Sequence, residues 1–515
     1  MKMMILAAVG LAAGALVAEV SKLDSRIADV HPDREAPTVM NIVNFVRGSE
    51  PRNSKLDLVL PLREEIALNT RYHLKNTILL QYDALLRDDL MAVARSAEAE
   101  LTEYGVWIEM CRQLIEKVGL VWRGRKGWDW DWYINPGFLM AYTQEERARI
   151  LDEVFRLFRE RFGRWPESMG SWLLDAWSMD YVQKKYGVKA FCICREQDNT
   201  DAYGLRGGFS NGGYYPSKRN MLSAAVDMEN AVRAPCFKML TPDPIYNYSV
   251  ESLKTKYDRG NGTVYTLEPV WEGGRVREIV DWYFKTYAGP GKLNFAYMQA
   301  GQENSFGWAN ISKGLPYQIK RIAALRDAGV LRVEQLRETG AAFIRDYPTT
   351  PPQTQVALTD WNGTGNQSVW YNSRYYRANL VNENGKLYLR DIHVMKDDFE
   401  EPFLARVCTG WLAEYFTPPV VDLYLANRKE ARGPIAFEGV CKGLSVVSSA
   451  DNRLEIRADR KEGAVAFVFE ENAFETRGAE LAGFAPGRHE LAFRGYRYSV
   501  LVEKTVQGVR MRFDK

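Results

Sequence analysis

The segment Ser168–Cys194, SMGSWLLDAWSMDYVQKKYGVKAFCIC, contains one complete strand–helix–strand unit. The apolar run Ser168–Leu174 has the composition of a buried strand, and Asp175–Tyr186 has the length and polarity of a surface helix. Gly187 follows the helix, where a left-handed residue ends many helices. The next apolar run, Val188–Cys194, is a second strand. Because strands joined through a helix lie parallel, this segment predicts a parallel α/β sheet.

The same alternation extends from residue 38 to residue 347. A helix that begins at Thr143 has a capping box with Glu146, and the helix Tyr317–Ala328 ends at Gly329. Seven or eight strands in this order favour a (β/α)7-8 barrel, with an open doubly wound sheet as the alternative. No glycine-rich phosphate-binding motif follows a strand. The predicted strands are Val39–Val46, Thr77–Tyr82, Gly105–Met110, Ser168–Leu174, Val188–Cys194, Cys236–Leu240, Thr263–Leu267 and Leu293–Met298.

Residues 348–515 have a different pattern. Beyond the linker-like Thr349–Pro352, most segments alternate between apolar and polar residues with a period of two. Turn sequences such as Pro486-Gly487 separate them. A short helix is expected around Arg406–Tyr415. The predicted fold class is therefore α/β, a (β/α) barrel catalytic domain in residues 38–347 followed by a C-terminal all-β sandwich domain in residues 348–515.

Residues 1–18 have the features of a secretory signal peptide. Lys2 precedes the apolar run Met3–Val17. That run is shorter than the roughly 20 residues that cross a bilayer, so cleavage is expected and an uncleaved anchor is the alternative. Residues 19–37 are polar, contain Pro32 and Pro37, and are predicted to be a linker. We therefore expect a secreted or periplasmic protein with no stable membrane insertion after signal cleavage.

Composition argues against nucleic acid as a partner and for a glycan. The net charge is +2 over 515 residues, far from the clustered basic excess that phosphate binding needs. Aromatic residues make up 12%, with 14 Trp and 27 Tyr. Such rings either fill a large core or stack against the C–H faces of sugars. The expected partner is an oligo- or polysaccharide substrate.

Carboxylates end several predicted strands, where the active site of a β/α barrel lies. Cleavage of a glycosidic bond needs two of them, one to protonate the leaving oxygen and one to attack the sugar or activate water. We predict Asp175 as nucleophile or base and Glu268 as acid, with Glu303 and Glu109 as further catalytic candidates. Asp175 alternatively caps the helix that follows it. The residues expected to bind substrate stand beside these carboxylates: Asp83, Trp107, Trp172, Arg195, Gln197, Asp198, Tyr214, Tyr215, Gln302 and Asn304.

Histidine and cysteine are too sparse for most metal chemistry. Of the four histidines, only His73 lies in the predicted barrel, and no His-x-x-x-His pair occurs. The six cysteines lack ligand spacing, and Cys192 and Cys194 point to the same side of one strand, so buried free thiols are expected. We therefore predict no metal site and no cofactor.

Four phrases of the sequence resemble an uncharacterised family of secreted bacterial proteins in the glycoside hydrolase/deacetylase barrel superfamily. They are CICREQ (192–197), YYPSK (214–218), MLTPDPIY (239–246) and LEPV (267–270). The resemblance covers most of residues 38–347 and implies a barrel that acts on glycans. In amylase-like members a nucleophile follows the fourth strand and an acid the seventh, and Asp175 and Glu268 match those places by strand order. The deacetylases of the superfamily bind a metal through Asp and two His, a pair that this chain lacks.

These observations favour a carbohydrate-active enzyme, with glycoside hydrolysis as the first hypothesis. Another carbohydrate enzyme, such as a polysaccharide deacetylase, a lyase or an epimerase, is the second hypothesis. A non-catalytic glycan-binding protein is the third. Dialysis against a chelator separates the first two, because a metal-dependent deacetylase loses activity and a carboxylate glycosidase does not.

Overall fold

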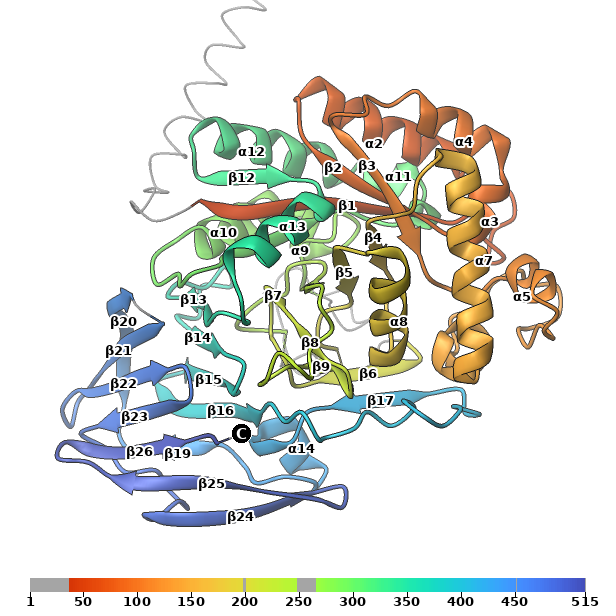
Figure 1. Cartoon of the computed structure of the whole chain (residues 1–515). Coiled ribbons are helices and arrows are strands. Elements are labelled where there is room, and N and C mark those ends of the chain that lie inside the picture. Colours follow the sequence, from red (N-terminus) through yellow and green to blue (C-terminus); the bar gives the residue numbers. More distant parts are fainter. Residues whose placement is uncertain (1–36, 198–200, 248–264, 451, 515) are drawn as a thin grey trace, which may run out of the picture.

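The computed structural model describes residues 37–197, 201–247, 265–450 and 452–514. The predicted signal peptide and nearly all of the predicted linker lie outside these ranges, so both stay predictions. Figure 1 shows two parts, a sheet surrounded by helices (red to green) and a set of antiparallel sheets (teal to blue). Within the described ranges, no helix combines the length and the apolar character that a membrane span requires.

Parallel strands form a curled sheet in the first part. They follow the order β11–β1–β2–β3–β4–β5–β10, with β7 antiparallel to β10, and β12 beside the start of β1. Seven of these parallel strands lie at strands predicted from the sequence, whereas β12, which is also parallel to β1, was not predicted. Their burial on both faces explains their apolar composition. The bounds are β1 (Thr38–Val46), β2 (Asn76–Leu80), β3 (Thr102–Trp107), β4 (Ser168–Gly170), β5 (Ala190–Ile193), β7 (Gly213–Tyr214), β10 (Cys236–Lys238), β11 (Tyr297–Ala300) and β12 (Leu331–Glu334).

Between β10 and β11, the curled sheet is joined by side chains instead of a strand ladder. The Thr241 hydroxyl donates to the carbonyl of Gln299 at 2.9 Å and accepts its amide at 2.7 Å. Of the predicted strand Thr263–Leu267, residues 263 and 264 lie outside the described ranges, and the described part forms one bridge, between Thr266 and Pro242. The sheet is thus a curled half-barrel, a coarser form of the predicted closed barrel.

Helices cover the outside of this sheet (Figure 1). The helix α7 (Gln144–Phe162) begins at the predicted capping box of Thr143 and Glu146. The helix α8 (Ala176–Tyr186) ends at Gly187, which has a left-handed φ of 73°. The other helices of this part are α2 (Val59–Arg71), α3 (Tyr82–Leu86), α4 (Asp88–Arg95), α5 (Arg112–Lys117), α6 (Ile134–Gly137), α9 (Glu272–Arg275), α10 (Arg277–Tyr287), α11 (Trp308–Ile311), α12 (Leu315–Asp327) and α13 (Leu336–Asp346).

The connection from β5 to β10 is long and carries β6 (Tyr203–Arg206), β7, β8 (Pro216–Ser217) and β9 (Asn220–Ala224). Strand β6 pairs in parallel with β17 (Ala413–Phe416), which comes from the C-terminal part. The helix predicted around Arg406–Tyr415 is therefore wrong, because the end of this segment extends as a strand along β6.

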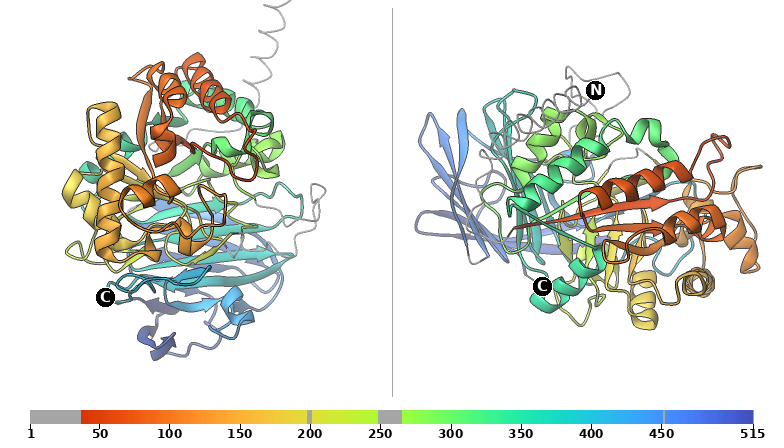
Figure 2. Two further views of the ribbon diagram at one scale, coloured as in Figure 1. Left: turned by 90° about the vertical axis from the view of Figure 1, so that its right-hand side faces the viewer. Right: turned by 90° about the horizontal axis from the view of Figure 1, so that it is seen from above.

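Beyond Pro352 the chain forms two antiparallel sheets, on one side of the curled sheet in both views of Figure 2. Their orders are β13–β14–β15–β16–β18, with β19 beside β16, and β20–β21–β22–β23–β26–β25–β24. One hydrophobic core contains residues of both sheets, as expected for packed sheets. The bounds are β13 (Gln353–Ala357), β14 (Gln367–Asn372), β15 (Tyr376–Glu383), β16 (Lys386–Val394), β18 (Pro419–Asp422), α14 (Leu423–Asn427), β19 (Ile435–Phe437), β20 (Cys441–Ala450), β21 (Arg453–Arg460), β22 (Val465–Glu470), β23 (Ala473–Arg477), β24 (Gly487–Phe493), β25 (Tyr496–Lys504) and β26 (Gly508–Arg512).

Candidate active site

A cavity of about 700 Å³ opens at the carboxyl ends of the parallel strands. Its walls come from loops that follow β1, β3, β4, β5, β10 and β11. Because all these strands run in the same direction, their following loops meet at one end of the sheet, where barrel enzymes have their sites. The charged residues that line the cavity are Glu109, Asp201, Glu268, Glu303, Arg47, Arg52 and Arg195.

Arg47 follows directly after β1 and holds two of the carboxylates. Its guanidinium donates to both oxygens of Glu109, at 2.9 and 3.0 Å, and its Nη1 lies 2.6 Å from Glu303 Oε2. Nη1 also donates to Ser305 Oγ, and the Ser305 hydroxyl donates to Glu303 Oε1. The guanidinium packs on the ring of Trp130, 4.2 Å from its centroid. This buried network fixes the positions of Glu109 and Glu303.

Glu109 is held by the indole of Trp107, which belongs to a cluster of three aromatic rings. Trp107 Nε1 donates to Glu109 Oε2 at 2.8 Å, and the Trp107 ring stacks on Phe45 at 3.9 Å. Trp172 meets both rings edge-on and lines the cavity itself. Trp107 was predicted to bind substrate. In the structure it instead orients Glu109, a carboxylate that lines the cavity.

Glu268 is a second buried carboxyl in the wall. Gln302 Nε2 donates to its Oε1 at 3.0 Å, and the Thr266 hydroxyl donates to its Oε2 at 3.1 Å. Burial raises the pKa of Glu268, and the negative charge of Glu303 adds to this effect, although the hydrogen bonds and the charge of Arg195 oppose it. A carboxyl that retains its proton to a higher pH than usual is suited to act as a general acid.

Asp201 lines the same cavity on the loop after β5. Burial raises the pKa of Asp201, and the charge of Glu303 raises it further. The charge of Glu303 thus raises the pKa of both Asp201 and Glu268.

Aromatic rings form the rest of the wall. Trp271 is 39% exposed. The ring of Trp132 is braced by Arg125, whose guanidinium lies 4.0 Å from its centroid and 3.6 Å from that of Trp128. Rings beside carboxylates are the usual surroundings of a bound sugar. The aromatic lining residues are Trp130, Trp132, Tyr133, Phe138, Trp172, Tyr203, Trp271 and Phe306.

The backbone is strained where β10 reaches the cavity. Leu240, which lines the cavity, has a φ of 71°, and Thr241 has a φ of 30°. A β-branched residue rarely adopts a positive φ. The two hydrogen bonds between the Thr241 hydroxyl and Gln299 hold this conformation. Strain of this kind persists mainly where a site requires it.

Asp175 lies outside the cavity, unlike the other predicted catalytic residues. It is fully buried at the N-cap of α8, where its Oδ1 accepts the Ser178 amide at 2.9 Å. Arg147 Nη1 donates to the same oxygen at 3.0 Å. The structure thus brings Glu109, Glu268 and Glu303 together and gives Asp175 the capping position that the sequence analysis left as its alternative.

A further acid lies beside Asp175. Glu401 accepts the amides of Ala176 and Met221, at 3.0 and 2.8 Å. Burial, together with the negative charge of Asp175, raises the pKa of Glu401 to about 8. This pair belongs to the packing of α8 against the chain beyond residue 348.

The residues predicted to bind substrate divide into those that line the cavity and those that hold lining residues in place. Arg195 and Gln197 line the cavity, whereas Gln302 holds Glu268. Asn304 accepts the amide of Arg47 and donates to its carbonyl. Asp83 accepts from Gly48 and Ser49, each at 2.8 Å, and so fixes the loop after β1.

Two other predicted residues, Tyr214 and Tyr215, are not among the residues that line the cavity. The Tyr214 hydroxyl donates to the carbonyl of Met221, and the Tyr215 hydroxyl donates to that of Tyr347. Asp198 lies outside the described residues.

The predicted site lacked Arg47 and Arg52, and it did not include Asp201, although that residue is one of the carboxylates that follow the fifth predicted strand. Arg47 had a usable signal, because a charged residue directly after the buried run Thr38–Val46 stands at a strand end like the predicted carboxylates. Arg52 and Asp201 lie in loops, where sequence gives no direction for a side chain.

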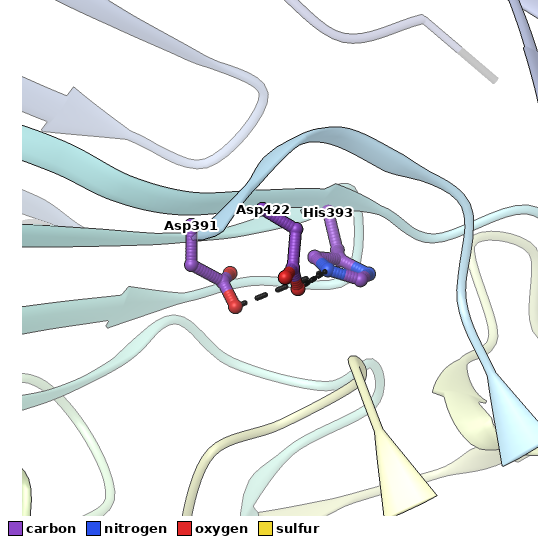
Figure 3. A group of neighbouring side chains, drawn as sticks. All are labelled: Asp391, His393 and Asp422. Atoms are coloured by element: carbon purple, nitrogen blue, oxygen red, sulfur yellow. Dashed lines mark hydrogen bonds and ion pairs between the residues drawn. The ribbon is translucent and has the colours of Figure 1, made fainter. Parts of the chain in front are cut away.

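Asp391, His393 and Asp422 in the C-terminal part lie close enough to share a metal ion, with ligand atoms within 4.8 Å of one another (Figure 3). However, Arg377 pairs with Asp391, and Arg206 Nη1 lies 3.7 Å from Asp422. His393 Nε2 lies 2.9 Å from Asp422, and Nδ1 lies 2.8 Å from a backbone carbonyl. Protein cations thus already neutralise these carboxylates, and none of the three residues lines the main cavity.

No family model matches the sequence, and no curated protein matches it. A solved structure of a candidate glycoside hydrolase/deacetylase from Parabacteroides distasonis has a TM-score of 0.58 at 13% identity, and the match covers 75% of this chain and 92% of that one. A candidate polysaccharide deacetylase from Mycobacterium smegmatis has a TM-score of 0.36 at 10% identity, over 62% of this chain and 94% of that one. The first likeness shows a shared fold. The second is too distant to support any argument.

Proposed function

We propose that this protein is a glycoside hydrolase in which Glu268 donates the proton to the leaving oxygen and Glu303 is the second catalytic carboxylate. One observation carries the proposal: Glu268 and Glu303, from two different loops, line one aromatic-walled cavity of about 700 Å³. Cleavage of a glycosidic bond requires two carboxyl groups around the bound sugar. The shared fold with a candidate glycoside hydrolase/deacetylase is compatible with this chemistry.

The two glutamates have different surroundings, which supports different roles. Burial raises the pKa of Glu268, so its proton is available at a pH where an ordinary carboxyl has lost it. Glu303 is held by Arg47 and Ser305, and the guanidinium favours the negative charge that a nucleophile or a base needs. Asp201 lines the same cavity and is positioned to contact substrate.

Substrate would bind against the indoles of the wall, with its hydroxyl groups directed to the polar side chains. Trp172 and Trp132 line the cavity beside the carboxylates. Among the described residues that line it, none is a histidine. The carboxylates therefore carry the chemistry in this proposal. We also propose that the protein is exported to an environment that contains glycans, because residues 1–18 have the features of a signal peptide.

The test is turnover of polysaccharides and aryl glycosides by Glu268→Gln and Glu303→Gln, each purified and checked by thermal melting. On polysaccharides, each substitution is expected to lower kcat by at least about a hundredfold, since general acid–base catalysis contributes 10²–10⁴-fold. Glu334→Gln, in β12 and away from the cavity, is the matched control. Wild-type rates in both active-site variants would refute the assignment, and release of acetate from acetylated glycans that is lost in EDTA would favour a metal-dependent deacetylase.

The pH profile tests the role of Glu268 separately. Because Glu268 must be protonated to act as the acid, kcat/KM is expected to be high at low pH and to fall as the pH rises through the raised pKa of Glu268. With aryl glycosides whose leaving group needs no proton, Glu268→Gln should lose much less activity. An unchanged high-pH limb in Glu268→Gln would assign that limb to another group.

A further inference from the structure

Arg195 is a buried cation in the cavity wall that forms no direct ion pair with a carboxylate among the described residues. It is 5% exposed and lies two residues after the end of β5. Its Nη1 donates to the carbonyl of Glu196 at 2.6 Å and to Asn247 Oδ1 at 2.9 Å, both of them uncharged acceptors. Its Nε is buried and has no hydrogen-bond partner. The carboxylates of Glu268 and Asp201 act on Arg195 only through the electrostatic field, and burial of a guanidinium without a direct ion pair is unfavourable.

The other arginines of the cavity are neutralised by the protein. Arg47 pairs with Glu109 and Glu303, and Arg52 pairs with Glu50. Arg147, buried behind the wall, pairs with Asp175. Arg195, which lines the cavity where a ligand would bind, has no such ion pair among the described residues.

The Arg195 guanidinium leaves one nitrogen for a ligand. Because Nη1 is occupied and Nε is buried, Nη2 is the nitrogen left to donate a charge-assisted hydrogen bond to a carboxylate. The loop is held in advance: Arg377 donates to both oxygens of the adjacent Glu196, at 2.8 and 2.9 Å, and the Gly207 amide donates at 3.0 Å. Such preorganisation favours binding.

We propose that Arg195 binds the carboxylate of an acidic sugar, so that the substrate is a glycan that contains uronic acid or a related sugar acid; this deepens and rests on the glycoside hydrolase function proposed above. The bound carboxylate supplies the direct ion pair that Arg195 lacks among the described residues. Binding of the sugar acid also affects Glu268, the proposed general acid. The charge of Arg195 lowers the pKa of Glu268, and a bound anion offsets that charge, so Glu268 keeps its proton more firmly when substrate is present.

Calorimetric titration with two matched pairs of probes tests the proposal: methyl glucuronide against methyl glucoside, and methyl galacturonide against methyl galactoside. Each pair differs only by a carboxylate in place of a hydroxymethyl group. The wild type is expected to bind at least one acid about tenfold or more tightly than its neutral partner, as a charge-assisted pair implies. Arg195→Met should abolish this preference, and Arg195→Lys should retain part of it.

Arg52→Met is the matched control, because Arg52 lines the same cavity but has Glu50 as its own partner. It should keep the preference for the acid. Titration in buffers of different ionisation enthalpy should show proton uptake on acid binding by the wild type and less uptake by Glu268→Gln, in which Asp201 is the remaining carboxyl whose pKa the charge of Arg195 lowers. Thermal melting verifies that each variant is folded, and if Arg195→Met does not fold, Arg195→Lys and Arg195→Gln carry the comparison.

The outcomes separate this inference from the proposed function. Equal binding or no binding of the acids by the wild type, or an undiminished preference in Arg195→Met, overturns the role of Arg195. If neutral glycans are then hydrolysed through Glu268, the proposed function stands alone. If acids bind through Arg195 but no acidic or neutral glycan is hydrolysed, the carboxylate site stands and the proposed hydrolase function is wrong.

Discussion

Asp175 and Glu268 are both buried carboxylates near strand ends, yet their hydrogen-bond partners differ. Asp175 has a buried arginine and a helix amide as partners and does not face the cavity. Glu268 has a glutamine and a threonine as partners and lies in the cavity wall. The first arrangement stabilises a fold, whereas the second leaves a carboxyl poised for proton transfer.

The substitution Asp175→Asn is expected to lower the free energy of unfolding by about 3–5 kcal/mol, because it leaves the Arg147 guanidinium buried without its charged partner. Activity below the melting temperature should remain. Asp57→Asn is the control, since Asp57 caps the start of α2 on the exposed surface and Asn caps helices equally well. Denaturant unfolding and steady-state kinetics measure both effects. A fall of several orders of magnitude in kcat with unchanged stability would instead restore Asp175 as the nucleophile.

At the scale of elements, the loop after β5 is fixed by a strand from the C-terminal part. Burial opposes ionisation of Glu196, but the charges of Arg377 and Arg206 lower its pKa overall. Arg377 belongs to β15, and Glu196 lies between the cavity residues Arg195 and Gln197. Strand β15 therefore determines the position of two residues that it does not adjoin in sequence.

Glu196→Gln is expected to raise KM several-fold and to lower kcat much less. The substitution removes the charge that Arg377 binds and so loosens Arg195 and Gln197, whereas Glu268 and Glu303 belong to other loops. The stability loss should be about 1–3 kcal/mol, because Arg377 keeps Asp391 as a partner. Glu471→Gln, which removes a less buried partner of Arg374 in the same part, is the control. Steady-state kinetics would contradict this positioning role if kcat fell and KM did not change.

At the scale of the whole molecule, the hydrophobic core of the barrel-like part continues past residue 348. Met395, Cys408 and Tyr415 belong to the same core cluster as Ile193 of β5. Strand β17 also pairs with β6. The two parts of the chain therefore share apolar burial as well as the ion pairs around Glu196.

A chain that ends at Tyr347 is expected to be insoluble or to lack cooperative unfolding, since it exposes that core and the edge of β6. A chain that begins at Pro37 is the control, because the described strands start at Thr38. Far-UV circular dichroism, solubility and thermal melting provide the measurements. Soluble, cooperatively melting residues 38–347 would show that the barrel-like part needs no support from the sheets.

Sequence alone determined the features that depend on neighbours a few residues apart. The capping box of Thr143 and Glu146, the helix stop at Gly187 and the buried strand runs all follow from local chemistry. It also placed Glu109, Glu268 and Glu303 near one another, because parallel strands share one direction and their ends meet.

Only the tertiary structure decided which buried charges have partners. Arg47 forms ion pairs with Glu109 and Glu303 on distant loops, whereas Arg195 forms no ion pair with a carboxylate among the described residues. Whether a charged side chain is neutralised depends on what packs against it within a few ångströms, and residues far apart in the chain supply those contacts. A sequence specifies such contacts only through the complete fold.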